Sequence, residues 1–345
     1  MKSIRILFFV LFAFAEFGVY ARHTTKINLP NELNGSYVRL MNDDTGELID
    51  TLLVTNGSVV FPSDRYSACV VNIDNKYGRF ILSDADIIYS IIVEEVEGGI
   101  RRRWESFGGY NDSIRALGER INAIGARYLN STRKEGRKKH LDDFNAALYD
   151  AISEHGNDLL GYRLFVMSGE QLPFSSLVEL VEKYPALSQY RKVNSIMAGR
   201  RNVAVTQPGN KFKDFTVTYE GKQHKLSDVV GHGDYVLLDF WASWCGPCRA
   251  EMPLIKEAYE KYKDKNLKIL GVAVSDDPAN SLEAATQMKL PWEIWVNGGK
   301  EASEAYNVTY IPLLILFAPD GTILERGIQK DDLLTILEKY LPSAD

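Results

Sequence analysis

The chain has 345 residues, of which 45% are hydrophobic and 25% charged, with a formal net charge of −6. This composition is typical of a globular protein of two or three domains and excludes a disordered or fibrous chain. There is no basic excess that would favour binding to nucleic acid. Three cysteines are too few for a scaffold held by disulfides, so a cysteine that matters should act through its reactivity.

Residues 1–21 have the pattern of a signal peptide. Lys2 and Arg5 precede the apolar run 6–15, and the segment ends in a small-residue cleavage pattern at Ala21. The run is shorter than the about 20 residues that cross a bilayer. We therefore expect export to the periplasm and no membrane span after cleavage. The alternative is an uncleaved N-terminal anchor.

Residues 22–107 are predicted to form a small antiparallel β-domain, because short apolar and β-branched runs alternate with turn-forming residues. Asn56-Gly57 predicts a hairpin. Cys69 lies in one of the runs and is expected to be a buried core residue, the alternatives being an intermolecular disulfide or a relay thiol. The expected strands cover 38–41, 48–54, 59–61, 68–73, 79–82 and 87–93.

Residues 108–204 are predicted to be helical, because apolar residues recur at helical spacing with prolines between the runs. The basic run 133–139 is interpreted as a solvated helix face rather than a nucleic-acid patch. The expected helices cover 110–129, 141–152, 159–167 and 175–184.

Residues 205–345 are predicted to form an α/β domain, because apolar strands alternate with helical patterns. Most of the acidic excess falls here, in pairs such as Asp276-Asp277 that a basic partner could recognise. The expected strands cover 215–219, 235–240, 267–274, 313–317 and 322–324, and the expected helices cover 247–262 and 331–340.

The most informative motif is Cys245-Gly246-Pro247-Cys248, where a buried strand passes into a helix. Cys245 faces the unpaired amides and positive dipole of the helix start, which favours a low-pKa, accessible thiolate. Cys248 lies one turn deeper and is suited to resolve a mixed disulfide. Gly246 allows the tight turn, and Pro247 lacks an amide hydrogen that would be unpaired there.

A zinc site is the alternative for a Cys-x-x-Cys pair. Zinc would need two further Cys or His ligands. Besides the pair, the chain has only Cys69 and five scattered histidines, which form no clear second pair. We therefore expect no metal and no bound cofactor.

The stretch 237–253 resembles the thioredoxin-like superfamily, and within it the exported thiol-disulfide oxidoreductases of the TlpA/ResA type. The resemblance covers residues 205–341 and implies a thioredoxin fold at the C-terminus. The β-domain and helical segment resemble in layout the accessory region that precedes such domains in some Gram-negative members.

The resemblance assigns roles to residues around the cysteines. It implies that Asp239 is a buried acid that helps to deprotonate Cys248, and burial should raise the pKa of its carboxyl group. The alternative is a carboxylate satisfied by local hydrogen bonds. Pro312 matches the family's cis-proline opposite the disulfide, where the backbone of Ile311 would bind a substrate chain. Leu313 departs from the small polar residue that many thioredoxins have there.

Glu251 matches the Cys-x-x-Glu-x-Pro pattern of the same type. It would tune the pKa of Cys248 or contact a substrate, or simply be a favourable acid in the first turns of a helix. Trp244 is expected to be an exposed contact for substrate beside Gly246 and Pro247, and Trp241 to be packing.

The expected activity is the reduction of disulfides in substrate proteins through the Cys245–Cys248 pair. The Gly-Pro dipeptide resembles reducing thioredoxins, with a potential near about −270 mV. The family implies a membrane thiol relay as electron donor, and a link to cytochrome c maturation. The alternatives are a disulfide oxidase or isomerase on the same fold, or a redox-switched binding or sensing protein.

Overall fold

The computed structural model describes residues 23–62, 68–73, 77–82, 86–96, 99–129, 134–219 and 221–341. The expected signal peptide, 1–21, lies outside the described residues. The chain divides into two compact units, 1–196 and 197–345, and the boundary falls inside helix α6 (Arg191–Val205). No helix within the described ranges is long and apolar enough to cross a membrane.

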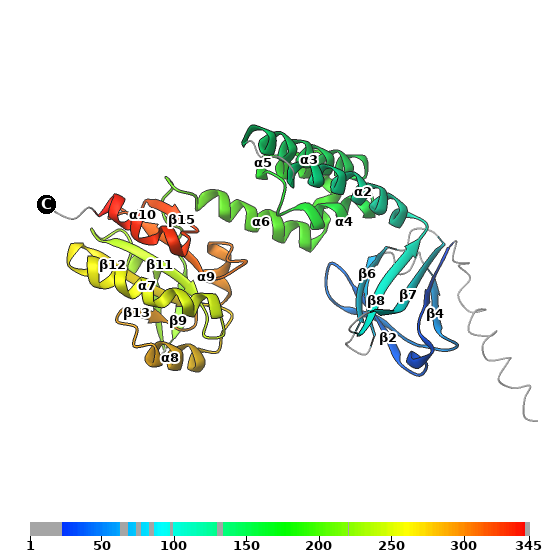
Figure 1. The fold of residues 1–345 in the computed structure, drawn as a ribbon, viewed down its shortest axis with the longest axis horizontal. Coiled ribbons are helices and arrows are strands. Elements are labelled where there is room, and N and C mark those ends of the chain that lie inside the picture. The colour runs from blue at the N-terminus through cyan, green and yellow to red at the C-terminus, as the bar shows by residue number, and fades with distance from the viewer. Residues whose placement is uncertain are drawn as a thin grey trace, which may run out of the picture. The chain divides into compact units, whose positions relative to one another are not determined.

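The first unit begins with two four-stranded sheets, in the orders β4-β1-β7-β8 and β3-β2-β5-β6. Their strands are drawn in blue to cyan in Figure 1. All pairs are antiparallel except β1 with β7, which is parallel, so the predicted antiparallel β-domain is confirmed with this one exception. Cys69 is fully buried in the core of this domain, as predicted, and burial raises the pKa of its thiol to about 12. The strands are β1 (Thr24–Asn28), β2 (Tyr37–Asn42), β3 (Leu48–Leu53), β4 (Ser58–Pro62), β5 (Ala68–Ile73), β6 (Tyr77–Leu82), β7 (Ile87–Val96) and β8 (Gly99–Phe107).

The predicted hairpin at Asn56-Gly57 is only partly correct. Both residues have positive φ, and an isolated antiparallel bridge joins Thr55 to Ser58. However, β3 and β4 on either side of this turn belong to different sheets. The Gly57 backbone is bonded to Leu29 and to the side chain of Asn34 instead, and β4 pairs with β1.

Helices follow the sheets in the first unit: α2 (Tyr110–Leu129), α3 (Lys134–Glu154), α4 (Leu159–Ser168), α5 (Phe174–Lys183) and α6. Helices α2, α4 and α5 lie close to the positions predicted from the sequence, whereas α3 begins before the expected 141. Helix α6 was not among the expected helices, although most of it lies in the segment 108–204 that was predicted to be helical. Asp158 caps α4 by accepting the amide hydrogens of Leu160 and Gly161.

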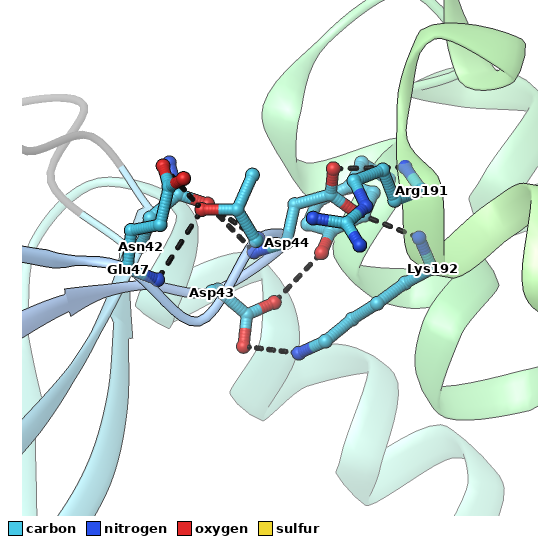
Figure 2. A network of polar contacts seen from close by, with 8 residues as sticks. Asn42, Asp43, Asp44, Glu47, Arg191 and Lys192 are labelled. Carbon is cyan, nitrogen blue, oxygen red and sulfur yellow. Dashed lines mark hydrogen bonds and ion pairs between the residues drawn. The ribbon is translucent and has the colours of Figure 1, made fainter.

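Two acidic residues in the turn between β2 and β3 connect the sheets to these helices (Figure 2). Asp44 caps α6 by accepting the backbone N–H groups of Arg191 and Lys192 at 2.8 and 2.7 Å. Asp43, which is buried, accepts hydrogen bonds from the Tyr162 hydroxyl at 2.8 Å and from Lys192 Nζ at 2.7 Å. The first unit therefore contains a polar junction between its sheets and its helices.

The second unit is built on a five-stranded sheet in the order β13-β12-β11-β14-β15. Strands β12 (Leu267–Ala273) and β13 (Glu293–Trp295) continue the sheet in parallel from the central strand β11 (Tyr235–Trp241). Strands β14 (Leu313–Phe317) and β15 (Ile323–Arg326) continue it in antiparallel pairs on the other side. A separate hairpin pairs β9 (Thr216–Tyr219) with β10 (Lys222–Lys225).

Each face of this sheet has its own core. Helices α7 (Gly246–Tyr262) and α10 (Leu333–Tyr340) supply residues to one core, and α9 (Gly299–Ala305) supplies residues to the other. Leu237 and Trp241 of β11 lie in the first core, whereas Val236, Leu238 and Phe240 lie in the second. The nearly continuous apolar run of β11 is thus explained by burial on both faces. Strands β10 and β13 and helices α8 (Pro278–Gln287) and α9 were not predicted from the sequence.

Candidate active site

The two cysteines of the motif form a disulfide at the start of α7, directly after β11. Cys245 is the N-cap residue, and its sulfur accepts the backbone N–H of Cys248 at 3.1 Å. Pro247 occupies the first turn, where no amide hydrogen is required. The helix start thus provides the amide environment that stabilises a thiolate on Cys245 when the disulfide is reduced.

Both cysteines are buried in the disulfide form, with Cys245 exposed to 3% and Cys248 to 1%. The expectation of an accessible Cys245 is therefore wrong for this state. The reason is the segment before Pro312, which covers the pair: the carbonyl oxygen of Ile311 lies 3.9 Å from the Cys245 sulfur. Within the described residues, no cluster of three or more His, Cys, Asp or Glu side chains is arranged to hold a metal ion.

The peptide bond between Ile311 and Pro312 is cis, as the resemblance implied. It precedes β14 and places Ile311 against the disulfide. Leu313, the unusual residue after the proline, is buried in the core on the other face of the sheet. The Leu313 side chain thus packs in that core, and the residue that contacts the disulfide from this segment is Ile311.

Asp239 lies in the middle of β11, exposed to 1%, and neither of its carboxylate oxygens has a hydrogen-bond partner among the described residues. These residues therefore do not supply the local hydrogen bonds that the alternative requires. Burial, assisted by the negative charge of Glu251, raises the pKa of Asp239 to about 8. A carboxyl group of this pKa exchanges protons near neutral pH, as an acid–base partner of a thiol must.

Glu251 lies on α7, one turn after Cys248, and is half-buried; its Oε2 has no hydrogen-bond partner among the described residues. Burial raises the pKa of Glu251, and the positive charge of Lys330 opposes this shift. Lys330 Nζ donates to the carbonyl oxygen of Ala250 at 3.1 Å. Lys330 was not predicted from the sequence, because no motif links it to a helix so far away along the chain.

The rim of the site carries two exposed aromatic side chains. Trp244 is 63% exposed, as expected for a contact residue, and its indole N–H donates to the carbonyl oxygen of Ser275 at 2.9 Å. Tyr310, two residues before the cis-proline, is equally exposed and was not predicted. Gly246 and Pro247 are exposed beside Trp244, whereas Trp241 is fully buried in the core, as expected.

Comparison with known proteins finds a family and several relatives. The AhpC/TSA family matches residues 208–326, which lie in the second unit. The thiol-disulfide oxidoreductase ResA of Bacillus cereus is 33% identical over 140 residues, which are 39% of this chain and 80% of ResA. ResA of Geobacillus kaustophilus is 33% identical over 138 residues, 39% of this chain and 78% of ResA. Among solved structures, the thioredoxin domain of a thiol-disulfide oxidoreductase from Bacteroides vulgatus is 30% identical, covering 39% of this chain and 97% of that domain, with a TM-score of 0.36.

The paired cysteines at a helix start, the cis-proline beside them and the buried acid in the central strand define a thiol-disulfide oxidoreductase of the thioredoxin fold. The C-terminal unit has this fold, as predicted, and follows the sheets and helices of the first unit. With this unit, the chain belongs to the ResA family of thiol-disulfide oxidoreductases.

Proposed function

We propose that the protein reduces disulfides of substrate proteins in the periplasm. The observation that carries the proposal is Asp239, a buried and unpaired carboxyl group in the strand that leads to the Cys245–Cys248 pair. It provides a proton acceptor for Cys248 in the resolving step. The reducing direction is supported by Gly246-Pro247 between the cysteines, a dipeptide shared with reducing thioredoxins.

The reaction begins with the reduced protein. The Cys245 thiolate attacks one sulfur of a substrate disulfide, and a mixed disulfide forms while the other substrate sulfur leaves as a thiolate and is protonated. Asp239 then takes the proton of the Cys248 thiol. The Cys248 thiolate attacks the Cys245 sulfur, closes the disulfide of the present structure and releases the second substrate thiolate. Two electrons have passed from the protein to the substrate.

We assign the substrate-binding surface to Trp244, Gly246 and Pro247 on one side of the disulfide and to Ile311 and Pro312 on the other. The exposure of Trp244 supports this assignment. So does the position of the Ile311 carbonyl, which lies against the Cys245 sulfur where an extended substrate segment would pass.

The sequence and the family support the proposed location and partners. The pattern of residues 1–21 supports export to the periplasm. A membrane thiol relay is the proposed donor that returns the pair to the dithiol. A role in cytochrome c maturation makes an apocytochrome c peptide with an oxidised Cys-x-x-Cys-His motif the first substrate to test.

The test is the reduction potential of the Cys245–Cys248 pair. The mature protein is equilibrated in glutathione or dithiothreitol buffers, its thiols are trapped by alkylation, and the mass shift is assigned to individual cysteines. We expect a potential near about −270 mV, the value of thioredoxin. A value above about −150 mV would instead identify a disulfide donor.

A Cys248→Ser variant tests the substrate step. It lacks the resolving thiol, so mixed disulfides between Cys245 and substrate proteins should accumulate and be recovered on non-reducing gels. The matched control is the double variant Cys245→Ser/Cys248→Ser, which should trap nothing. If Cys248→Ser also trapped nothing, the redox-switched binding protein would be favoured over the reductase.

A further inference from the structure

Asp276 lies at the carboxyl end of β12, next to the carboxyl end of the parallel strand β11, where the active-site loop begins. Residues 242–245 of this loop belong to no helix or strand. A backbone hydrogen bond from Cys245 N–H to the Ala242 carbonyl closes a turn within the loop, and side-chain contacts hold the loop to its neighbours. The sequence suggested only that the pair Asp276-Asp277 was acidic surface, but the carboxylate of Asp276 is directed at the loop.

The carboxylate of Asp276 accepts four hydrogen bonds. Oδ2 of Asp276 accepts the backbone N–H of Ser243 at 2.6 Å and the hydroxyl of Ser281 at 2.6 Å. Oδ1 accepts the hydroxyl of Ser243 at 3.0 Å and the backbone N–H of Asp277 at 2.9 Å. Ser281 is fully buried in the first turns of α8, so it holds the carboxylate from a fixed element.

Three hydrogen bonds hold Ser243 and Trp244, the two residues that precede the catalytic Cys245. Ser243 is bonded through both its backbone and its side chain, and Trp244 is bonded through its indole to Ser275, the residue before Asp276. Ser275 has a φ of 53°, a left-handed conformation that is uncommon for a residue other than glycine. The segment 275–276 thus holds the loop from the β12 side of β11, whereas Ile311 precedes β14 on the other side of β11.

We propose that Asp276 is a positioning residue of the oxidoreductase reaction, which fixes the backbone of Ser243 so that Cys245 stays aligned with the amide groups at the start of α7. The inference rests on the thiol-disulfide chemistry of the Cys245–Cys248 pair. The alignment matters most in the reduced protein, because no disulfide then holds Cys245, and its thiolate depends on the helix start for stabilisation.

The competing role for Asp276 is that of a negative charge near the thiolate, and it predicts the opposite sign. A nearby anion raises the pKa of a thiol, so loss of the charge alone would lower the pKa of Cys245. Loss of the anchor would raise that pKa, because the sulfur would no longer be held at the helix start. The variants Asp276→Ala and Asp276→Asn separate the two roles: both remove the charge, but an asparagine can still accept the Ser243 N–H.

The experiment measures the pKa of the Cys245 thiol, from the pH dependence of its alkylation in the reduced protein, and kcat/KM with a small disulfide. For Asp276→Ala we expect a raised thiol pKa and a kcat/KM that falls about tenfold, the effect of losing hydrogen bonds to a charged group. For Asp276→Asn we expect kcat/KM and the acid dissociation constant of the thiol to stay within about threefold of wild type. Ser243→Ala, which loses one of the two Ser243 bonds, should raise the thiol pKa less than Asp276→Ala does.

The matched control is Asp277→Ala. Asp277 is the acid next to Asp276 in the segment between β12 and α8, but its side chain caps α8 by accepting the Ala279 N–H instead of a group of the active-site loop. This variant should lose stability through the cap yet keep the thiol pKa and kcat/KM of wild type.

Three results would overturn the proposal: equal lowering of the thiol pKa in Asp276→Ala and Asp276→Asn, no change in Asp276→Ala, or equal effects of Asp276→Ala and Asp277→Ala. If Asp276→Ala does not fold, Ser243→Ala decides alone, and an unchanged thiol pKa in it would contradict the anchor. Failure of the proposed function would be recognised separately, because the wild-type protein itself would then show no cycling of the cysteine pair.

Discussion

Asp239 is buried, and its two carboxylate oxygens have no hydrogen-bond partner among the described residues. This environment affects the stability of the fold as well as the reaction. The pKa of Asp239 is raised from 3.8 to about 8 in the folded protein. Between these two values the folded state keeps a proton that the unfolded state releases. Stability from this group is therefore fully present below about pH 4 and is lost as the pH rises through about 8.

We predict that Asp239→Asn increases the free energy of unfolding of the second unit, because the amide has no charge to bury. The gain should be largest above pH 8, on the order of a few kcal/mol, and should shrink towards pH 4. Urea unfolding at pH 5, 7 and 9 measures it, with the exposed Asp331→Asn as control. A gain of the same size at all three pH values would contradict this electrostatic origin.

The same variant should also slow the resolving step of the reaction, since it lacks the proton acceptor for Cys248.

The sequence identified those site residues that carry a local or family pattern, and no others. Cys245, Cys248 and Pro312 lie in short motifs, and a charge within an apolar strand marks Asp239. Asp276 lies in no such motif and outside the apolar strands. Its role depends on the pairing of β11 with β12, which brings the ends of two strands together. The carboxyl ends of neighbouring parallel strands lie at the same edge of a sheet. Only this rule could have placed Asp276 near the active-site loop before the structure was known.

At the scale of secondary-structure elements, periodicity predicts which face of a strand is buried but not which strand is its neighbour. This explains why the strands of the first unit were largely predicted whereas the parallel pairing of β1 with β7 was not. The turn at Asn56-Gly57 is a similar case. Its residues favour positive φ locally, but long-range pairing with β1 takes β4 into another sheet. Short or polar elements such as β10 and α9 have too few apolar positions to show a period.

The junction between the sheets and α6 gives a prediction at this scale. Asp43 is buried and bonded to Lys192 and Tyr162, so its removal leaves two polar groups without their partner. We expect Asp43→Ala to lower the free energy of local opening in β2 and α6 by about 2–3 kcal/mol. Amide hydrogen exchange of these two elements measures this opening without requiring the whole chain to unfold in one step.

The control for Asp43→Ala is Asp142→Ala, which removes an exposed pair with Lys138 on α3. Such a surface pair contributes about 0.5 kcal/mol or less, so exchange in β2 and α6 should not change. Equal exchange in the two variants would show that the buried carboxylate does not hold the junction together.

At the scale of the whole molecule, the residues of the redox site lie in one unit. The cysteines, Asp239, Glu251, Asp276 and Pro312 fall between residues 197 and 345, and the two cores of that unit are composed of its own residues. The first unit has a separate core, in which Cys69 is buried. The second unit therefore contains the cysteine pair, the acidic residues and the cis-proline around it, and the cores that hold them in place.

This separation predicts the behaviour of a truncated chain. A protein of residues 191–345, which keeps α6 whole, should fold and show a reduction potential within about 30 mV of the full chain, a difference of about 1.4 kcal/mol. Its kcat/KM with a small disulfide should also match that of the full chain, because Asp239, Asp276 and Pro312 are all retained. The same truncation carrying Asp276→Ala should show the slower rate expected for the full-length variant. A potential shifted by more than about 30 mV in the unsubstituted truncation would mean that the first unit acts on the cysteine pair in one of its redox states, and would assign it a direct part in the reaction.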